Sequence, residues 1–237
     1  MLRTLFFLAG FFPWTLFVLL AGLPLSLLGP DTLHHWAHLW ARGSLWLAGV
    51  KVRCAGAEHL RPGAAVVYMP NHQSNFDILA LLACIRPPFR WLAKKELFAI
   101  PLFGTAMRRA GCIAVDRADH QSAMASMDEA ARRIRAGEAV MIFPEGTRSL
   151  NGRLQPFKKG GFVTAIKAQA PIVPIAITGS GSILPKHARC LRPGTIAVTV
   201  LPPIDTRAMS LDDRDLLMER VRQNLENILP AAEAEAT

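Results

Sequence analysis

The chain begins with a long run of apolar residues. No charged side chain occurs between Arg3 and Asp31. This run is longer than the apolar region of a secretory signal peptide, about 7–15 residues. It also exceeds the roughly 20 residues that cross a bilayer as a helix. Pro13 and Pro24 interrupt it, so one straight spanning helix is not required. Residues 1–49 are therefore predicted to form an N-terminal membrane anchor.

The next segment has an amphipathic helical pattern. Apolar side chains recur on one side, and histidines with an arginine fall on the other. The first set is Leu33, Trp36, Trp40, Gly43 and Leu47; the second is His34, His35, His38 and Arg42. Tryptophans on a helix with a polar face favour the membrane interface. We expect either a helical hairpin or a spanning helix followed by an interfacial helix. The alternative is that the aromatic side chains pack on the following domain.

From residue 50 onward, short apolar runs typical of strands alternate with helical patterns. Strands are expected at 50–54, 64–69, 89–92, 112–115, 139–143, 172–177 and 195–201, and helices at 75–84, 118–136, 161–168 and 211–228. Gly137 is placed as a C-cap, and Ser210 with Asp213 matches a capping box. The alternation predicts an α/β fold with a mostly parallel central sheet flanked by helices. One domain is expected at 50–230 and a flexible tail at 231–237.

Charge is distributed unevenly along the 237-residue chain, whose formal net charge is +9. Six basic side chains and one acidic residue lie between positions 86 and 109, whereas eight acidic residues outnumber four arginines after Ile204. A basic cluster suits anionic lipid headgroups or nucleic acid. The apolar anchor favours lipid, and no RNA-stacking pattern accompanies the cluster in a chain with one tyrosine. We therefore expect membrane lipids as partners and no nucleic acid.

The four cysteines are Cys54, Cys84, Cys112 and Cys190. They form no C-x-x-C pair and have no histidine spacing typical of zinc. We interpret them as small apolar residues in a reducing compartment. This interpretation predicts no metal site and places the α/β domain on the cytoplasmic side.

A histidine and an aspartate follow the second expected strand in an H-x4-D pattern, His72 and Asp77. His72 lies in the turn between strand and helix, where reactive side chains are commonly placed. Asp77 and Ser74 also match a capping box, which gives this carboxylate a purely structural alternative. From that position Asp77 is able to accept the Nδ1 proton of His72 and orient the other nitrogen as a general base. His72 and Asp77 are the candidate catalytic pair.

Arg117 follows the strand expected at 112–115 and offers a planar guanidinium suited to phosphate. The alternative is an exposed arginine that pairs with Asp116 or Asp119. Lys94 is a second candidate cation, because it lies among apolar residues where a phosphate head would meet an acyl tail.

Glu145-Gly146-Thr147-Arg148 follows another expected strand, at the edge where open α/β sheets bind ligands. Gly146 allows close approach of the backbone to a ligand. Arg148 offers a bidentate grip on an anion. We interpret Glu145 as a buried partner that holds Arg148 or Arg117, in preference to a second acid or base.

Four blocks in this order resemble the glycerolipid acyltransferase family, most closely the 1-acyl-sn-glycerol-3-phosphate acyltransferases. The blocks are N-H-x-S-x-x-D at 71–77, G-x-I-x-x-x-R at 111–117, F-P-E-G-T-R-S at 143–149 and V-P-x-x-I at 173–177. The resemblance extends over about residues 50 to 205, including Leu184-Pro185-Lys186, and no motif position departs from the family pattern. The N-terminal anchor also looks like the family's two-helix membrane element.

The resemblance implies transfer of a fatty acyl group from acyl-CoA or acyl-acyl carrier protein to the sn-2 hydroxyl of lysophosphatidic acid. His72 is the implied base and Asp77 its partner, with no cofactor or metal. The implied substrate-binding residues are Lys94, Gly111, Arg117, Glu145, Gly146, Thr147 and Arg148. The implied location is the cell inner membrane, with the catalytic domain on the cytoplasmic side.

Two alternatives remain open. In the first, the acceptor is another lysolipid, such as an amino-acid-containing one. In the second, the chain is a non-catalytic binder of anionic lipid. A serine hydrolase is disfavoured because the chain has no G-x-S-x-G sequence.

Overall fold

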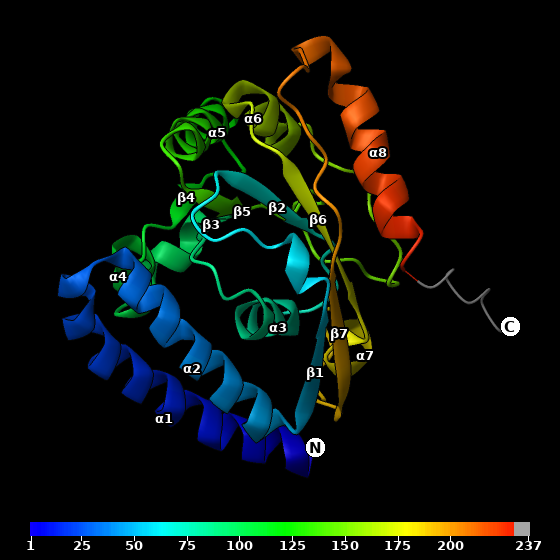
Figure 1. Cartoon of the computed structure of the whole chain (residues 1–237). Coiled ribbons are helices and arrows are strands. Elements are labelled where there is room, and N and C mark those ends of the chain that lie inside the picture. The colour runs from blue at the N-terminus through cyan, green and yellow to red at the C-terminus, as the bar shows by residue number, and fades with distance from the viewer. Residues whose placement is uncertain (230–237) are drawn as a thin grey trace, which may run out of the picture.

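The computed structural model describes residues 1–229 and has a seven-stranded sheet at its centre (Figure 1). The strand order is β1-β7-β6-β2-β5-β3-β4, and every neighbouring pair is parallel except β6 and β7. The strands are β1 Val50–Ala55, β2 Val66–Pro70, β3 Arg90–Lys94, β4 Ile113–Val115, β5 Ala139–Met141, β6 Ile172–Thr178 and β7 Gly194–Val200. Each lies on an expected run, so the mostly parallel α/β fold is confirmed. The tail expected at 231–237 lies outside the described residues.

The central strands are buried on both faces. Every residue of β2 is buried, as is all of β6 except Thr178. Helices cover both sides of these strands, which is why their sequences are continuously apolar. One core lies between the sheet and α2 and α3, and the other lies between the sheet and α5, α6 and α8.

Four of the domain's helices correspond to expected ones: α3 Phe76–Cys84, α5 His120–Arg135, α6 Gly160–Ala168 and α8 Arg214–Glu226. Gly137 follows α5 with a φ of +102°, and the Ser210–Asp213 capping box precedes α8. Two short helices were not expected, α4 Phe103–Arg109 and α7 Ser180–Ile183. They have too few residues for a helical period to stand out in the sequence.

The N-terminal residues form two helices that pack side by side, α1 Leu2–Leu25 and α2 Pro30–Ala48 (Figure 1). Trp36 Nε1 donates to the carbonyl of Val18 at 2.8 Å, and Trp40 Nε1 donates to Thr15 Oγ1 at 3.0 Å. The hydrogen bonds of these two tryptophans are therefore made to α1, within the N-terminal helix pair, and not to the following domain as the alternative interpretation held. The third tryptophan of the helix, Trp46, is 79% exposed.

Part of the histidine side of α2 packs on the α/β domain, while His35 is exposed. His34 is buried, and its ring lies edge-on to Phe89 with 4.6 Å between centroids. The expectation of a polar face at the membrane interface is therefore wrong for His34. An imidazole presents an aromatic face as well as polar atoms, so a histidine on a helix does not by itself indicate an exposed side.

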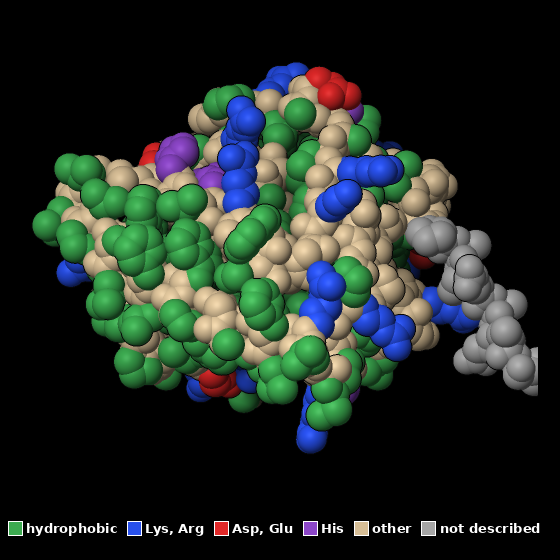
Figure 2. Space-filling view, turned by 90° about the horizontal axis from the view of Figure 1, so that it is seen from below, with side chains coloured by type: hydrophobic (Ala, Val, Ile, Leu, Met, Phe, Trp, Pro, Cys, Tyr) green, Lys and Arg blue, Asp and Glu red, His purple; other side chains and the backbone are tan. Residues whose placement is uncertain are grey.

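The outer face of α1 is apolar and exposed. Its exposed side chains include Leu5, Phe6, Phe12, Leu16, Phe17 and Leu20, and Leu27 and Leu28 continue the surface at the turn. Figure 2 shows this apolar surface on one side of the molecule, beside a region with several lysines and arginines. The segment Leu2–Leu28 is long and apolar enough to cross a membrane, by length and composition alone.

A disulfide joins Cys54 of β1 to Cys84 at the end of α3. The interpretation of all four cysteines as free is therefore wrong for this pair, while Cys112 and Cys190 are free. Thirty residues separate the two bonded cysteines in the sequence, and only the packing of α3 beside β1 brings them together.

Candidate active site

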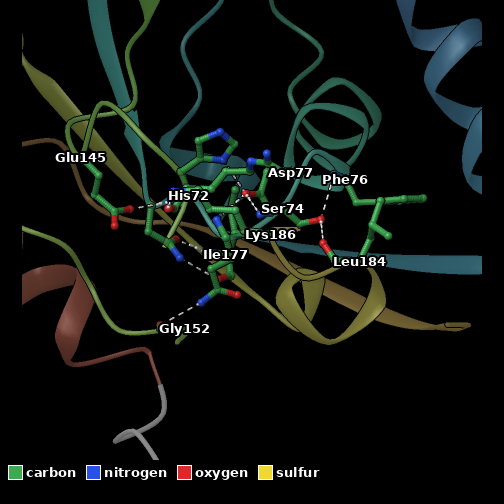
Figure 3. A network of polar contacts seen from close by, with 12 residues as sticks. His72, Ser74, Phe76, Asp77, Glu145, Gly152, Ile177, Leu184 and Lys186 are labelled. Carbon is green, nitrogen blue, oxygen red and sulfur yellow. Dashed lines mark hydrogen bonds and ion pairs between the residues drawn. The ribbon is translucent and has the colours of Figure 1, made fainter. Parts of the chain in front are cut away.

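His72 and Asp77 meet at the carboxyl edge of the sheet. His72 follows β2, and Asp77 lies in the first turn of α3. His72 Nδ1 is 2.7 Å from Asp77 Oδ2; the carboxylate is fully buried, and 15% of the His72 side chain is exposed (Figure 3). When Nδ1–H donates to Asp77, Nε2 retains its lone pair. This geometry suits a general base.

Asp77 also organises the turn that carries His72. Its Oδ2 accepts the backbone N–H groups of Gln73 at 2.7 Å and Ser74 at 2.9 Å. The expected capping box is only half formed. Ser74 Oγ accepts from Phe76 N at 3.3 Å and donates to the carbonyl of Leu184 at 2.8 Å. The capping and the orienting roles of this carboxylate thus occur together.

An aromatic stack supports the histidine ring. Phe143, at the start of the F-P-E-G-T-R-S segment, stacks on His72 with 3.9 Å between centroids and an interplanar angle of 19°. Trp91 of β3 lies behind Phe143 at 6.0 Å. The ring of His72 is therefore held by a hydrogen bond to Asp77 at one nitrogen and by the aromatic face of Phe143.

Glu145 fixes the backbone of His72. Its Oε1 accepts from His72 N at 2.6 Å, and its Oε2 accepts from Gln155 N at 2.8 Å. The side chain is 1% exposed. The expectation that Glu145 holds Arg148 or Arg117 is therefore wrong, because backbone amides take both oxygens. Burial raises the pKa of Glu145 to about 7, although the two amide donors act in the opposite direction.

Two further contacts hold this turn in place. Ser149 N donates to the carbonyl of His72 at 2.8 Å. Asn71 pairs its amide with the backbone of β6, donating to the carbonyl of Ile177 at 2.9 Å and accepting from Ile177 N at 2.7 Å. The motif included Asn71 and Ser149, but their roles depend on partners from distant parts of the chain. Sequence reasoning therefore missed them as positioning residues.

Two arginines converge on the segment that follows β5. Arg117 Nη1 donates to the carbonyl of Gly146, which has a φ of +69°. The alternative pairing of Arg117 does not occur, because Asp116 pairs with Lys95 and Asp119 caps α5. Within residues 1–229, the Arg148 guanidinium takes part in no hydrogen bond or ion pair. Both charges are thus available to an anionic ligand.

Lys94 and Thr147 lie at the same edge of the sheet. Lys94 ends β3, but its ammonium pairs with Glu96 at 3.2 Å, and both side chains are more than half exposed. Thr147 is exposed, and its Oγ1 accepts from Lys186 at 3.3 Å. Lys94 is therefore a weaker candidate for binding an anion than Arg117 and Arg148, which have no carboxylate partner in residues 1–229.

Gly111 lies at the other end of the sheet. It precedes β4, whereas His72 follows the carboxyl end of the parallel strand β2. A side chain at Gly111 would meet Arg133 Nη2 at 2.9 Å and Arg90 Cδ at 3.2 Å. The expected contact of Gly111 with substrate is therefore not supported by the structure. This glycine has a φ of +74° and permits close packing ahead of β4.

Comparisons with known proteins agree with this geometry. Residues 51–178, more than half of the chain, match the family model described as Acyltransferase. A human 1-acyl-sn-glycerol-3-phosphate acyltransferase alpha is 36% identical over 181 residues, or 76% of this chain and 64% of the human protein. The mouse protein of that name is 32% identical over 216 residues, which cover 90% of this chain and 76% of the mouse protein. The chain thus spans just under two thirds of the human relative.

The fold also matches a solved structure. The crystal structure of the 1-acyl-sn-glycerophosphate (LPA) acyltransferase PlsC from Thermotoga maritima has a TM-score of 0.81 with this chain. The match covers 98% of this chain and 97% of the other at 24% identity, which establishes a shared fold. The family model and the mouse relative show that the chain belongs to the Acyltransferase family.

Proposed function

We propose that the protein transfers a fatty acyl group from an acyl thioester to the sn-2 hydroxyl of lysophosphatidic acid, forming phosphatidic acid. The observation that carries the proposal is the His72–Asp77 pair at 2.7 Å, at the same edge of the sheet as Arg148, which follows β5, and Arg117, which donates to the carbonyl of Gly146. The relatives named 1-acyl-sn-glycerol-3-phosphate acyltransferase support this choice of acceptor.

The proposed step is a single displacement at the thioester carbonyl. His72 Nε2 removes the proton of the acceptor hydroxyl as its oxygen attacks the carbonyl carbon. The C–S bond then breaks, and the thiolate leaves and takes up the proton from His72. Asp77 stabilises the imidazolium that exists between the two transfers. The products are the diacylated lipid and the free thiol of the donor.

The acceptor phosphate is assigned to Arg148 and Arg117, which present guanidinium groups without a carboxylate partner in the described residues. Guanidinium–phosphate hydrogen bonds are charge-assisted and often bidentate. Lys94 adds positive charge nearby, offset by Glu96. In this proposal Glu145 and Gly146 shape the pocket rather than neutralise the ligand.

The apolar outer face of α1 is proposed to hold the chain on the cell inner membrane. Exposed Phe6, Phe12 and Phe17 would enter the acyl region, and neighbouring basic side chains would contact anionic headgroups. The α/β domain is proposed to lie on the cytoplasmic side, where acyl-CoA and acyl-acyl carrier protein are found. The basic surface would also attract an acidic carrier protein.

The reaction is tested with purified protein, an acyl donor and lysophosphatidic acid, with products identified by mass spectrometry. We expect phosphatidic acid from the wild type and a loss of about 10²–10⁴-fold in turnover in His72→Ala, as for removal of a general base. His120→Ala, at the exposed start of α5, is the matched control and should retain activity. Turnover of His72→Ala within a few-fold of wild type would refute the role of the base.

A second acceptor class is separable in the same assay. If other lysolipids, including an amino-acid-containing one, are acylated with a higher kcat/KM than lysophosphatidic acid, the acceptor assignment is wrong while the chemistry stands. If the folded protein acylates none of the acceptors, the remaining alternative is a non-catalytic binder of anionic lipid.

A further inference from the structure

The connection between β6 and β7 contacts two motifs of the site, the N-H-x-S-x-x-D segment at 71–77 and the F-P-E-G-T-R-S segment at 143–149. The carbonyl of Leu184 accepts a hydrogen bond from Ser74 Oγ at 2.8 Å. Ser74 lies two residues after His72 in the sequence. Two residues beyond Leu184, Lys186 Nζ donates to the carbonyl of Arg148 at 3.1 Å and to Thr147 Oγ1 at 3.3 Å. Figure 3 shows Lys186 in the same network as His72 and Asp77.

The Lys186 ammonium is not neutralised by a carboxylate within the described part of the chain. An ammonium has three N–H donors, and the two oxygens just named take two of them. The side chain is half-buried, so its position is defined by the surrounding protein. One donor and a full positive charge therefore remain beside Arg148.

The backbone next to Lys186 has an unusual conformation. His187 has a φ of +72°, a region that residues other than glycine seldom adopt. The turn is closed by hydrogen bonds from Ala188 N to the carbonyl of Pro185 at 3.0 Å and from Arg192 N to that of Ile183 at 2.9 Å. Such conformations are maintained at functional sites when the surrounding contacts enforce them.

Two cations from different elements thus hold the backbone of one short segment. Arg117, from the connection between β4 and α5, donates to the carbonyl of Gly146; Lys186, from the connection after α7, donates to that of Arg148. A neutral donor would be enough to support a loop. Cations without counter-ions add a concentrated positive field, which suits an anion with several acceptor oxygens.

We infer that Lys186 is a further acceptor-binding residue that determines specificity for the phosphate monoester, with its third N–H donating to a phosphate oxygen. This inference rests on the proposed function. The ammonium also holds Arg148 in place through the carbonyl of that residue.

The test measures steady-state kinetics with lysophosphatidic acid for wild type, Lys186→Met, Lys186→Arg and the control Lys167→Met. Lys167 lies on α6 and pairs with Asp128, away from the carboxyl edge of the sheet. We expect Lys186→Met to raise the acceptor KM about 10–100-fold, the range of a charged hydrogen bond, with kcat within about three-fold. Lys186→Arg should recover most of this loss, and Lys167→Met should equal the wild type.

Competition by sn-glycerol 3-phosphate, which has the phosphate but no acyl chain, gives a second readout. Its inhibition constant should rise in Lys186→Met by the same factor as the acceptor KM. A fall in kcat at unchanged KM and inhibition constant would overturn the inference and leave Lys186 as a support for the loop. Unchanged kinetics would also overturn it, whereas a wild type that forms no phosphatidic acid would refute the proposed function instead.

Discussion

At the scale of residues, the carboxylates of the site have partners within the protein, whereas its guanidinium groups have no carboxylate partner in the described residues. The buried carboxylates of Asp77 and Glu145 accept hydrogen bonds within the protein, Asp77 through Oδ2 from His72 and two backbone amides, and Glu145 through both oxygens from backbone amides. The guanidiniums of Arg117 and Arg148 have no carboxylate partner among residues 1–229. Because a buried charge is costly unless it is paired, the carboxylates act within the protein, whereas exposed Arg117 and half-buried Arg148 are available to a ligand.

Replacement of Arg148 by alanine should mainly weaken acceptor binding. Loss of a charge-assisted hydrogen bond is expected to raise the KM for lysophosphatidic acid by about 10–100-fold, with a smaller effect on kcat. The variant should also discriminate less between phosphorylated and unphosphorylated acceptors. Arg220→Ala on α8 is the control, since this arginine is exposed on another part of the surface. An unchanged acceptor KM would contradict the role of Arg148.

Glu145 should make stability depend on pH. Burial raises its pKa from 4.5 to about 7, so between these values the native state binds a proton that the unfolded chain has released. The contribution to stability is complete below about pH 4.5 and is lost as the pH rises through about 7. Across this window, the unfolding free energy of the wild type should fall by about 3 kcal/mol relative to Glu145→Gln. Urea unfolding at about pH 4 and about pH 8, on either side of this window, measures the change; parallel pH curves would contradict it.

At the scale of elements, α2 connects α1 to the α/β domain. One side of this helix binds α1 through Trp36 and Trp40, and another packs His34 against Phe89. The α1–α2 pair is therefore tied to the sheet domain by buried contacts, including Phe7 of α1 in the same core as α3. If the exposed apolar face of α1 binds a bilayer, these contacts consequently hold the carboxyl edge of the sheet at a defined position relative to that bilayer.

Charges on the exposed face of α1 should weaken membrane binding. The double variant Phe12→Glu, Phe17→Glu removes two side chains that are 64% and 56% exposed. Since burial of one phenylalanine contributes about 1.5–3 kcal/mol, binding to anionic vesicles should fall at least tenfold in a flotation assay. Leu216→Glu, on the exposed face of α8, should leave flotation unchanged. Equal flotation of the double variant and the wild type would exclude this face as the anchor.

At the scale of the whole molecule, the order of the strands creates the site. β2, β3, β4 and β5 are parallel, so the residues after each strand meet at one edge of the sheet although they are far apart in sequence. The connection after β6 brings Lys186 to the same place. The Cys54–Cys84 disulfide joins β1, an edge strand of the sheet, to the helix that carries Asp77. Since disulfides are typical of oxidising compartments, this bond removes the sequence argument for a cytoplasmic domain.

The side of the membrane can be measured with Cys190, which is free and exposed. A cytoplasmic α/β domain predicts that a membrane-impermeant maleimide labels Cys190 in inside-out vesicles and not in right-side-out vesicles. Cys190→Ser is the control and should not be labelled. The other free cysteine, Cys112, reacts poorly, because it is less exposed and burial raises the pKa of its thiol. Labelling of right-side-out vesicles alone would place the domain on the opposite side.

By itself the sequence determined the seven strands, the four principal helices, the mostly parallel sheet and the pairing of His72 with Asp77. These features depend on local hydrophobic periodicity and on residues within one turn of each other. The partners of Glu145 and Asn71, the packing of His34, the disulfide and the position of Lys186 were decided only by the tertiary structure. Each depends on contacts between segments distant in sequence, and local residue patterns do not encode which distant backbone groups a buried side chain will meet. Gly111 shows the converse. Although it belongs to a motif, it precedes β4, which is parallel to β2, so it lies at the amino edge of the sheet and not at the carboxyl edge that holds His72.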